Sequence, residues 1–157
     1  MPLFNISDLR ATLPTGMRLI GLDPGRKLIG VALSDVALSV ASPFGTLRRG
    51  KLAANAAEVR EVADRENVGG LVVGLPLSMD GTFGPAAQAA KDWGLAISDA
   101  TGIPAAMWDE RLSSAAANRF LIERADVSRG KRAAAVDRMA AAWMLQSALD
   151  ATRPAQC

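Results

Sequence analysis

The chain has 157 residues, of which 50% are hydrophobic and 22% are charged, and this balance predicts one folded domain rather than a disordered chain. It contains no histidine and a single cysteine, Cys157, so histidine-based catalysis, histidine-ligated zinc, intrachain disulfides and iron–sulfur clusters are excluded. The net charge of +2 favours an anionic partner only weakly. Carboxylate, hydroxyl, lysine and arginine chemistry remains, and in an enzyme it favours Mg²⁺ or Mn²⁺.

The first sixteen residues lack the basic start and long apolar stretch of a signal peptide, and no run of the chain is long enough to span a membrane. We therefore expect a cytoplasmic protein that has no membrane partner. Residues 1–16 are predicted to form a loose extension with one helical turn after Ser7, residues 17–150 a single domain and residues 151–157 a C-terminal tail.

Three short apolar runs follow the extension, and turn residues separate them. Pro24-Gly25 joins the first two as a hairpin, and Pro43 breaks the chain before the third. The predicted strands are Met17–Leu22, Lys27–Ser34 and Phe44–Arg48. Asp23 ends the first strand. An aspartate in Asp-Pro-Gly commonly caps a turn, but a carboxylate that ends a central strand opposite a glycine also suits a metal or phosphate site.

The rest of the chain alternates between apolar residues at helical spacing and short apolar runs. Helices are predicted at Lys51–Glu66, Pro85–Thr101, Ser113–Glu123 and Gly130–Asp150. Two further strands, at Leu71–Gly74 and Ala105–Trp108, lie between the first three helices. This order predicts an α/β fold, in which a mixed sheet is flanked by helices and its parallel strands are joined by helical crossovers.

Acidic residues are placed at one edge of this predicted sheet. Asp23 ends the first strand, and Asp109 and Glu110 directly follow the fifth. These two strands are parallel in this layout, so their carboxyl ends share the edge where open α/β sheets bind ligands. Asp137 lies in the last helix among alanines that permit close packing, although on its own it would be a solvated position paired with a neighbouring arginine. Converging acids repel one another unless cations neutralise them, and such a cluster suits two divalent cations about 4 Å apart that promote phosphodiester hydrolysis.

Four segments, in a fixed order, carry a resemblance to a known family. They are Gly21-Leu-Asp-Pro-Gly-Arg-Lys-Leu-Ile-Gly-Val-Ala, Val73-Gly-Leu-Pro-Leu-Ser-Met-Asp-Gly81, Asp109-Glu-Arg-Leu-Ser-Ser114, and Lys131 with Asp137-Arg-Met-Ala-Ala-Ala-Trp-Met-Leu-Gln146. Together they resemble the YqgF family, also called RuvX, which is related to the RuvC Holliday-junction resolvases. The resemblance extends over roughly Met17 to Leu149.

The resemblance implies an RNase H-like α/β fold with a five-stranded mixed sheet of order 3-2-1-4-5, and a divalent-metal-dependent nuclease. The implied role is processing of the 5′ end of pre-16S rRNA during ribosome biogenesis, and cleavage of branched DNA is the competing assignment. By motif position, Asp23, Glu110 and Asp137 take the places of the catalytic, metal-binding acids, with two Mg²⁺ or Mn²⁺ ions suspected. Asp109 would be a fourth metal ligand, or a hydrogen-bond acceptor that does not touch the metal itself.

Arg111, Lys131 and Lys27 are implied to bind substrate phosphates. The chain departs from the family pattern at Leu28, where an arginine is common. The RuvC relatives also carry an acid on the fourth strand, whereas Val72-Val-Gly74 has none. Glu110 therefore has to substitute from the neighbouring strand.

Two other function classes remain open. Actin-like ATPases and sugar kinases use a similar strand–turn–strand for phosphate and Mg²⁺, but they need two such lobes, and this chain has the length of one. The other class is a non-catalytic RNA-binding ribosome-assembly factor. A symmetric homodimer would suit a junction resolvase, which cuts two strands, and a monomer would suit single-strand trimming.

Aromatic and basic residues give weaker signals. Trp108 and Trp143 are expected to pack in the core, and the place of Trp93 is left open. The basic cluster at residues 48–51 is expected to be solvated loop charge.

Overall fold

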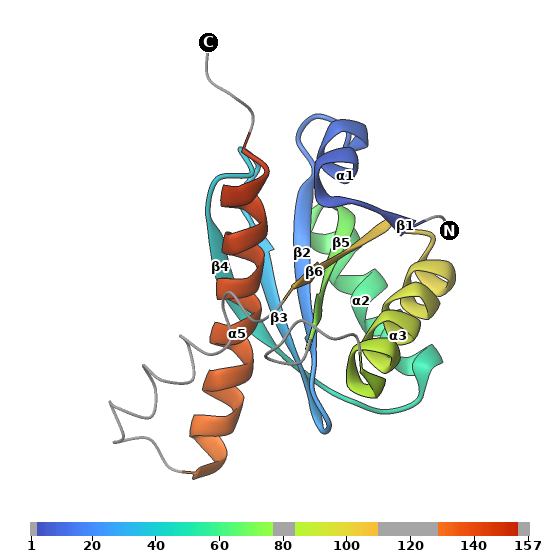
Figure 1. The fold of residues 1–157 in the computed structure, drawn as a ribbon, viewed down its shortest axis with the longest axis vertical. Coiled ribbons are helices and arrows are strands. Elements are labelled where there is room, and N and C mark those ends of the chain that lie inside the picture. Colours follow the sequence, from blue (N-terminus) through green and yellow to red (C-terminus); the bar gives the residue numbers. More distant parts are fainter. Residues whose placement is uncertain (1–2, 77–83, 110–128, 154–157) are drawn as a thin grey trace.

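The computed structural model describes residues 3–76, 84–109 and 129–153, and of residues 3–4 and 129–138 it describes the backbone alone. Its elements are β1 (Leu3–Phe4), α1 (Ile6–Thr12), β2 (Arg18–Pro24), β3 (Leu28–Ser34), β4 (Ala41–Arg48), α2 (Leu52–Glu66), β5 (Val68–Leu75), α3 (Pro85–Thr101), β6 (Ala105–Asp109) and α5 (Arg129–Ala151). The sheet lies between two helical layers, with α2 and α3 on one face and α5 and α1 on the other (Figure 1). The predicted helix at Ser113–Glu123 lies outside the described residues.

The strands are ordered β1-β6-β5-β2-β3-β4. β2, β3 and β4 pair antiparallel, while β2, β5, β6 and β1 pair parallel. The predicted RNase H-like order of the five main strands is therefore confirmed, with β2 in the middle. β5 is the longest of the parallel strands. Nearly all of its residues are buried, as expected for a strand that is covered on both faces.

The N-terminal segment is docked rather than loose at residues 3–12, and the expected helical turn is part of a longer helix, α1. β1 adds a short sixth strand beside β6, and α1 buries Ile6 and Leu9 against the sheet. Asn5 caps the helix by accepting a hydrogen bond from the backbone N–H of Asp8 at 2.8 Å. Arg10 then reaches the far end of the chain, where its Nη1 donates to the Leu149 carbonyl oxygen at 3.0 Å.

β4 begins earlier than the sequence predicts, because Pro43 does not break the strand. β4 is an edge strand, and its register with β3 is irregular between Val31 and Ala32, where Pro43 and Phe44 are accommodated. A proline is tolerated at an edge strand and at a bulge because it has no N–H to contribute to the ladder.

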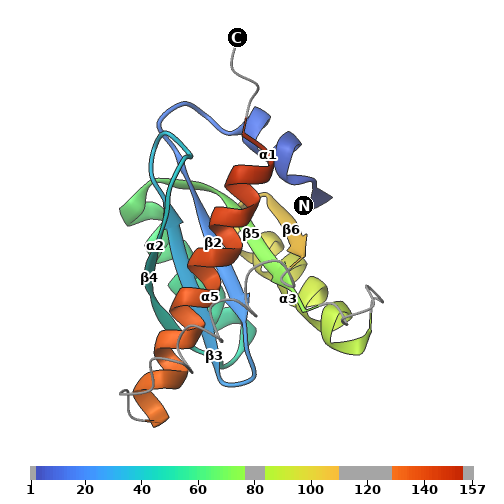
Figure 2. The same cartoon turned by 60° about the vertical axis from the view of Figure 1, so that its left-hand side comes forward.

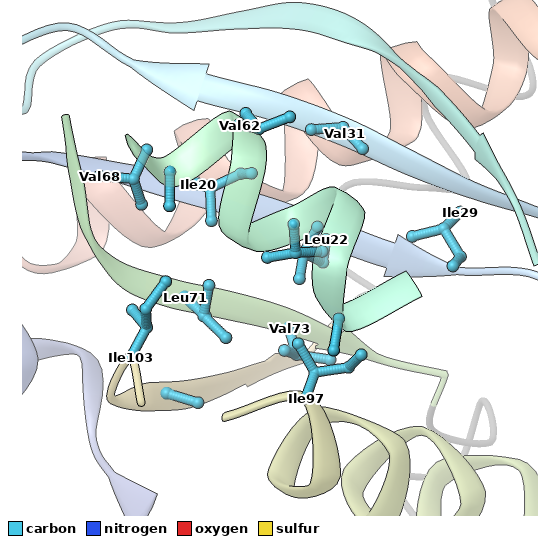
Figure 3. Packing of buried hydrophobic residues seen from close by; sticks show 14 of the residues in the cluster. Ile20, Leu22, Ile29, Val31, Val62, Val68, Leu71, Val73, Ile97 and Ile103 are labelled. Atoms are coloured by element: carbon cyan, nitrogen blue, oxygen red, sulfur yellow. The ribbon is translucent and has the colours of Figure 1, made fainter. Parts of the chain in front are cut away.

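Two hydrophobic cores hold the layers together. The first lies under α2 and α3 and contains Ile20, Leu22, Leu71, Val73 and Ile97 among others (Figure 3). The second lies under α5 and α1, where small alanines of α5 alternate with leucines. None of the helices in the described part of the chain is long and apolar enough to cross a membrane.

The tryptophans differ from expectation. Trp93 is 8% exposed in the first core, and Trp108 packs partly against the second. Trp143 is 43% exposed, so its predicted place in the core is wrong. Successive helical residues are turned by about 100°, which places Trp143 on the far side of α5 from Ala141 and Leu145.

Replacement of Leu9 by alanine tests the docking of α1. Leu9 is fully buried, so the variant should lose about 2–4 kcal/mol of unfolding free energy in urea denaturation. Ser7→Ala on the same helix changes an exposed residue and should stay within about 0.5 kcal/mol of wild type. Equal effects of the two changes would mean that α1 is not docked.

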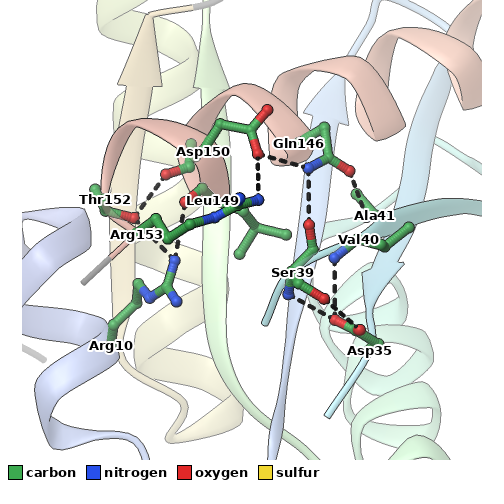
Figure 4. A network of polar contacts seen from close by, with 11 residues as sticks. Arg10, Asp35, Ser39, Val40, Ala41, Gln146, Leu149, Asp150, Thr152 and Arg153 are labelled. Atoms are coloured by element: carbon green, nitrogen blue, oxygen red, sulfur yellow. Dashed lines mark hydrogen bonds and ion pairs between the residues drawn. The ribbon is translucent and has the colours of Figure 1, made fainter. Parts of the chain in front are cut away.

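The β3–β4 connection gives a pH-dependent prediction. Asp35 accepts hydrogen bonds from the backbone N–H groups of Val40 and Ser39 and from the Ser39 hydroxyl, and these bonds hold its pKa below the usual value (Figure 4). A lowered pKa stabilises the folded state above the unfolded value of about 3.9, and this contribution disappears as the pH falls through the folded pKa. The difference in unfolding free energy between wild type and Asp35→Asn, measured in urea, should therefore shrink as the pH falls below about 5. A difference that stays constant would contradict this role, whereas Ser39→Ala should raise the pKa of Asp35 measured by NMR.

Candidate active site

Asp23 lies inside β2 rather than after it, one residue before the strand ends. Its partner on β3 is Gly30, and the next register position on β5 after the Leu22–Val73 pair is Gly74. Asp23 thus has a residue without a side chain on each neighbouring strand. Asp23 as a residue is 9% exposed. This confirms the predicted position of Asp23 opposite a glycine at the carboxyl edge of the sheet.

The face of the sheet to which Asp23 belongs follows from strand alternation. Leu19 belongs to the core under α5, while Leu22 belongs to the core under α2 and α3. Because successive residues of a strand point to opposite faces, Gly21 and Asp23 lie on the α5 face with Leu19. The candidate site is therefore on the face that α5 crosses.

Helix α5 approaches β2 closely at Gly21. A Cβ atom on Gly21 would lie 2.9 Å from Leu145 Cβ and 3.3 Å from the Ala141 carbonyl oxygen. The helix runs over β2 and β3, and its N-terminal end lies toward the β2–β3 hairpin (Figures 1 and 2). Helix position 137 precedes Ala141 by four residues, and so lies one turn nearer that hairpin.

The tip of the β2–β3 hairpin is fixed by β4. The Gly25 N–H donates to the Leu28 carbonyl oxygen at 2.9 Å, which closes the turn. Arg49 Nη1 donates to the Gly25 carbonyl oxygen at 2.8 Å, and the Arg49 N–H donates to the Lys27 carbonyl oxygen at 2.8 Å. The Arg49 guanidinium also lies 5.9 Å from the Trp93 ring centre, within cation–π range. Lys27 is exposed at this supported tip.

Arg49 is a residue that sequence reasoning missed, because its cluster was expected to be solvated. The signal that identifies it is the pairing of Leu28 with Arg48, which sets Arg49 beside the hairpin turn. That pairing depends on the irregular register of β4, so the sequence pattern did not reveal it. Arg48, the preceding residue, is exposed as expected.

Asp109 ends β6 beside Leu75 of β5. Met107, two residues earlier, packs against the core under α2 and α3. Alternation therefore assigns Asp109 to that face, which is opposite to the face of Asp23. Strand alternation thus separates Asp109 from Asp23, although both lie near the carboxyl ends of their strands.

The other predicted site residues are only partly described. Glu110 and Arg111 lie outside the described residues, and for Lys131 and Asp137 the structure gives the helix backbone alone. Within the described residues, no group of three or more histidine, cysteine, aspartate or glutamate side chains is placed to hold a metal ion. The carboxylate of Asp23 nevertheless offers the oxygen ligands that a hard divalent cation prefers. The glycine opposite it on β3 places no side chain beside it.

Comparison with known proteins identifies the family. The model of the family described as "RuvX: Holliday junction resolvase" matches residues 17–151. A protein of Gluconacetobacter diazotrophicus named "Putative pre-16S rRNA nuclease" is 64% identical over 152 residues, covering 97% of this chain and 99% of that protein. A protein of the same name from Gluconobacter oxydans is 62% identical over 154 residues, covering 98% and 96%.

Among solved structures, the fold is similar to that of T. thermophilus RuvC in complex with a Holliday junction substrate. The TM-score is 0.51 at 18% identity, with 86% of this chain and 94% of that chain covered. This likeness concerns the fold alone. From the matched family model and the relatives that share most of its length, the chain belongs to the RuvX family.

Proposed function

We propose that this protein is a divalent-metal-dependent nuclease that hydrolyses phosphodiester bonds and processes the 5′ end of pre-16S rRNA. One observation carries the proposal: a buried carboxylate, Asp23, lies between two glycine positions on the sheet face that α5 crosses closely. Membership of the RuvX family and the names of the relatives support it.

The proposed metal ligands are Asp23, Glu110 and Asp137. Strand alternation supports Glu110. Trp108 packs against the core under α5, on the face of Asp23, and a residue two positions further along an extended chain would share that face. Helical spacing supports Asp137, which is one turn from Ala141, the residue that touches Gly21. Asp109 is assigned to the opposite face, and we propose that it orients its neighbours from there. Two bound Mg²⁺ or Mn²⁺ ions would supply an activated water and stabilisation of the leaving oxygen.

Basic residues near this edge are proposed to hold the substrate backbone. Lys27 stands exposed at a hairpin tip that Arg49 fixes, so its ammonium can meet a phosphate close to Asp23. Arg111 directly follows the proposed ligand Glu110, and Lys131 belongs to the first turn of α5. A guanidinium can bind a phosphate through two parallel hydrogen bonds, whereas an ammonium acts as a point charge.

Junction cleavage is the second candidate function, because the matched family model is described as a Holliday junction resolvase. A junction has two strands to cut, so this function would favour a homodimer with two sites. Trimming of a single RNA strand needs one site, so a monomer would suffice.

Replacement of Asp23 by asparagine tests the carboxylate site. The rate of cleavage of a labelled pre-16S rRNA 5′ leader in Mn²⁺ should fall by more than about 100-fold. Mutation of a residue that only hydrogen-bonds to a metal ligand typically costs about 10- to 100-fold, and loss of the ligand itself should cost more. Asp64→Asn is the control, since Asp64 is 61% exposed on α2 and should leave the rate unchanged. Retention of full activity in Asp23→Asn would contradict the proposed site.

The substrate decides between the candidate functions. Cleavage of the leader but not of a four-way DNA junction supports rRNA processing, and cleavage of the junction alone supports the resolvase function. If wild type binds RNA and cleaves neither substrate with Mg²⁺ or Mn²⁺, the nuclease proposal is wrong and the protein is an assembly factor.

Lys27→Ala tests the phosphate contact. If Lys27 neutralises one phosphate, the slope of log affinity against log salt should become shallower by about 0.7 for a single-stranded substrate. Arg153→Ala removes the same charge at the distant C-terminal end of α5, and its slope should match wild type. Equal changes in both variants would show that only net charge matters.

A further inference from the structure

We infer that Gly21 is a positioning residue for the metal site: by letting α5 pack directly on β2, it sets the separation between Asp23 and Asp137. This inference rests on the proposed function, because it takes both acids as ligands. Gly21 has no side chain to touch a substrate or an ion, so it acts only through the elements that carry the acids.

The two acids occupy the same level of the fold. Asp23 lies two residues beyond Gly21 on β2, a distance of about 6.6 Å along the strand. Asp137 lies four residues before Ala141 on α5, a distance of about 6 Å along the helix axis. Since α5 runs against β2, both steps lead from the contact at Gly21 toward the hairpin end (Figures 1 and 2).

The contact at Gly21 cannot be relieved by rotating a side chain. The two nearest atoms that a Cβ would meet are Leu145 Cβ, at 2.9 Å, and the Ala141 carbonyl oxygen, at 3.3 Å, while Leu145 Cδ2 lies at 3.4 Å. Neither is the end of a flexible chain. An ordinary carbon–carbon contact is about 3.5–4.0 Å, so alanine at position 21 would push the helix away by on the order of 1 Å.

The C-terminal half of α5 is held in place against this push. Gln146 Oε1 accepts from the Ala41 N–H at 2.8 Å, and Gln146 Nε2 donates to the Ser39 carbonyl oxygen at 2.9 Å (Figure 4). Arg10 donates to the Leu149 carbonyl oxygen at 3.0 Å. The helix would therefore rotate about this end. Position 137 is about 18 Å from Leu149 and Ala141 is about 12 Å from it, so the displacement at 137 would be about 1.5 times that at 141.

Such a displacement should weaken metal binding selectively. Mg²⁺ needs nearly ideal octahedral geometry at about 2.0–2.1 Å, whereas Ca²⁺ accepts flexible coordination at about 2.3–2.6 Å. Moving one ligand by more than 1 Å should therefore reduce Mg²⁺ and Mn²⁺ affinity more than Ca²⁺ affinity.

The experiment measures the Mn²⁺ affinity of the full chain by electron paramagnetic resonance. The Mg²⁺ and Ca²⁺ affinities are measured by competition with bound Mn²⁺, and the unfolding temperature is measured in EDTA. Gly21→Ala should weaken Mn²⁺ binding by about 10-fold or more, and shift the preference toward Ca²⁺. The matched control is Gly70→Ala on the same sheet face, where a Cβ would lie 2.7 Å from Leu19 Cδ2, at the other end of β2. It adds the same methyl group to the same sheet face, and because Leu19 Cδ2 is the end of a side chain that can rotate, it should leave Mn²⁺ affinity within about twofold of wild type.

Equal loss of affinity in the two glycine variants, or no loss in Gly21→Ala, overturns the inference. If Gly21→Ala does not fold, Gln146→Ala decides, because it frees the other end of the helix and should also weaken Mn²⁺ binding without touching the site. If Asp23→Asn binds Mn²⁺ as well as wild type does, or if wild type does not bind Mn²⁺, the proposed metal site is wrong, and the inference about Gly21 is wrong with it.

Discussion

Helix α5 packs closely against β2 at Gly21, where the strand contributes no side chain, and we infer that the arrangement of the candidate site depends on this contact. The contact is possible because α5 presents alanine and leucine to the sheet, while the bulkier Trp143 lies on its outer side. Gln146 and Arg10 then tie the helix to β4 and α1. The position of α5 along β2, the strand that carries Asp23, is therefore fixed by packing and by hydrogen bonds at some distance from the carboxylate.

The sheet contributes a rigid and uncrowded base. Asp23 belongs to the central strand, which is paired on both sides, so its backbone has little freedom to move. Gly30 and Gly74 place no side chains beside it at that register. Arg49 links the hairpin tip to Trp93 and so to the helices of the opposite layer. A site that holds cations in strict geometry needs such support, because ligands set on mobile loops do not keep their distances.

Much of the fold could be predicted because the signals are local. The apolar runs and turn residues predicted the five main strands, the resemblance to the RuvX family implied their order, and the helix Pro85–Thr101 was predicted to the residue. What was missed depends on contacts between distant segments. α1 is docked through Leu9 and through Arg10, whose partner Leu149 lies at the other end of the chain. The early start of β4 depends on a bulge that the sequence does not mark.

The candidate site was predictable to a similar extent. Local signals placed Asp23 at the end of a strand and opposite a glycine, but Asp-Pro-Gly is commonly only a turn, so its proposed role as a metal ligand depended on the family resemblance. The face of Asp109 could not be assigned, since it depends on where β6 begins, and one residue of register reverses the face. Arg49 was missed for the same reason, because its partner is set by strand pairing rather than by its neighbours in sequence.

The most direct test of the account is a crystal structure of the protein soaked in Mn²⁺, with anomalous scattering used to locate the metal. If Asp23 is a metal ligand, we expect two anomalous peaks about 4 Å apart on the α5 face of the sheet, one of them bound by a carboxylate oxygen of Asp23. Saturating Mn²⁺ that gives no peak at Asp23, or a peak bound only on the opposite face of the sheet, would contradict it.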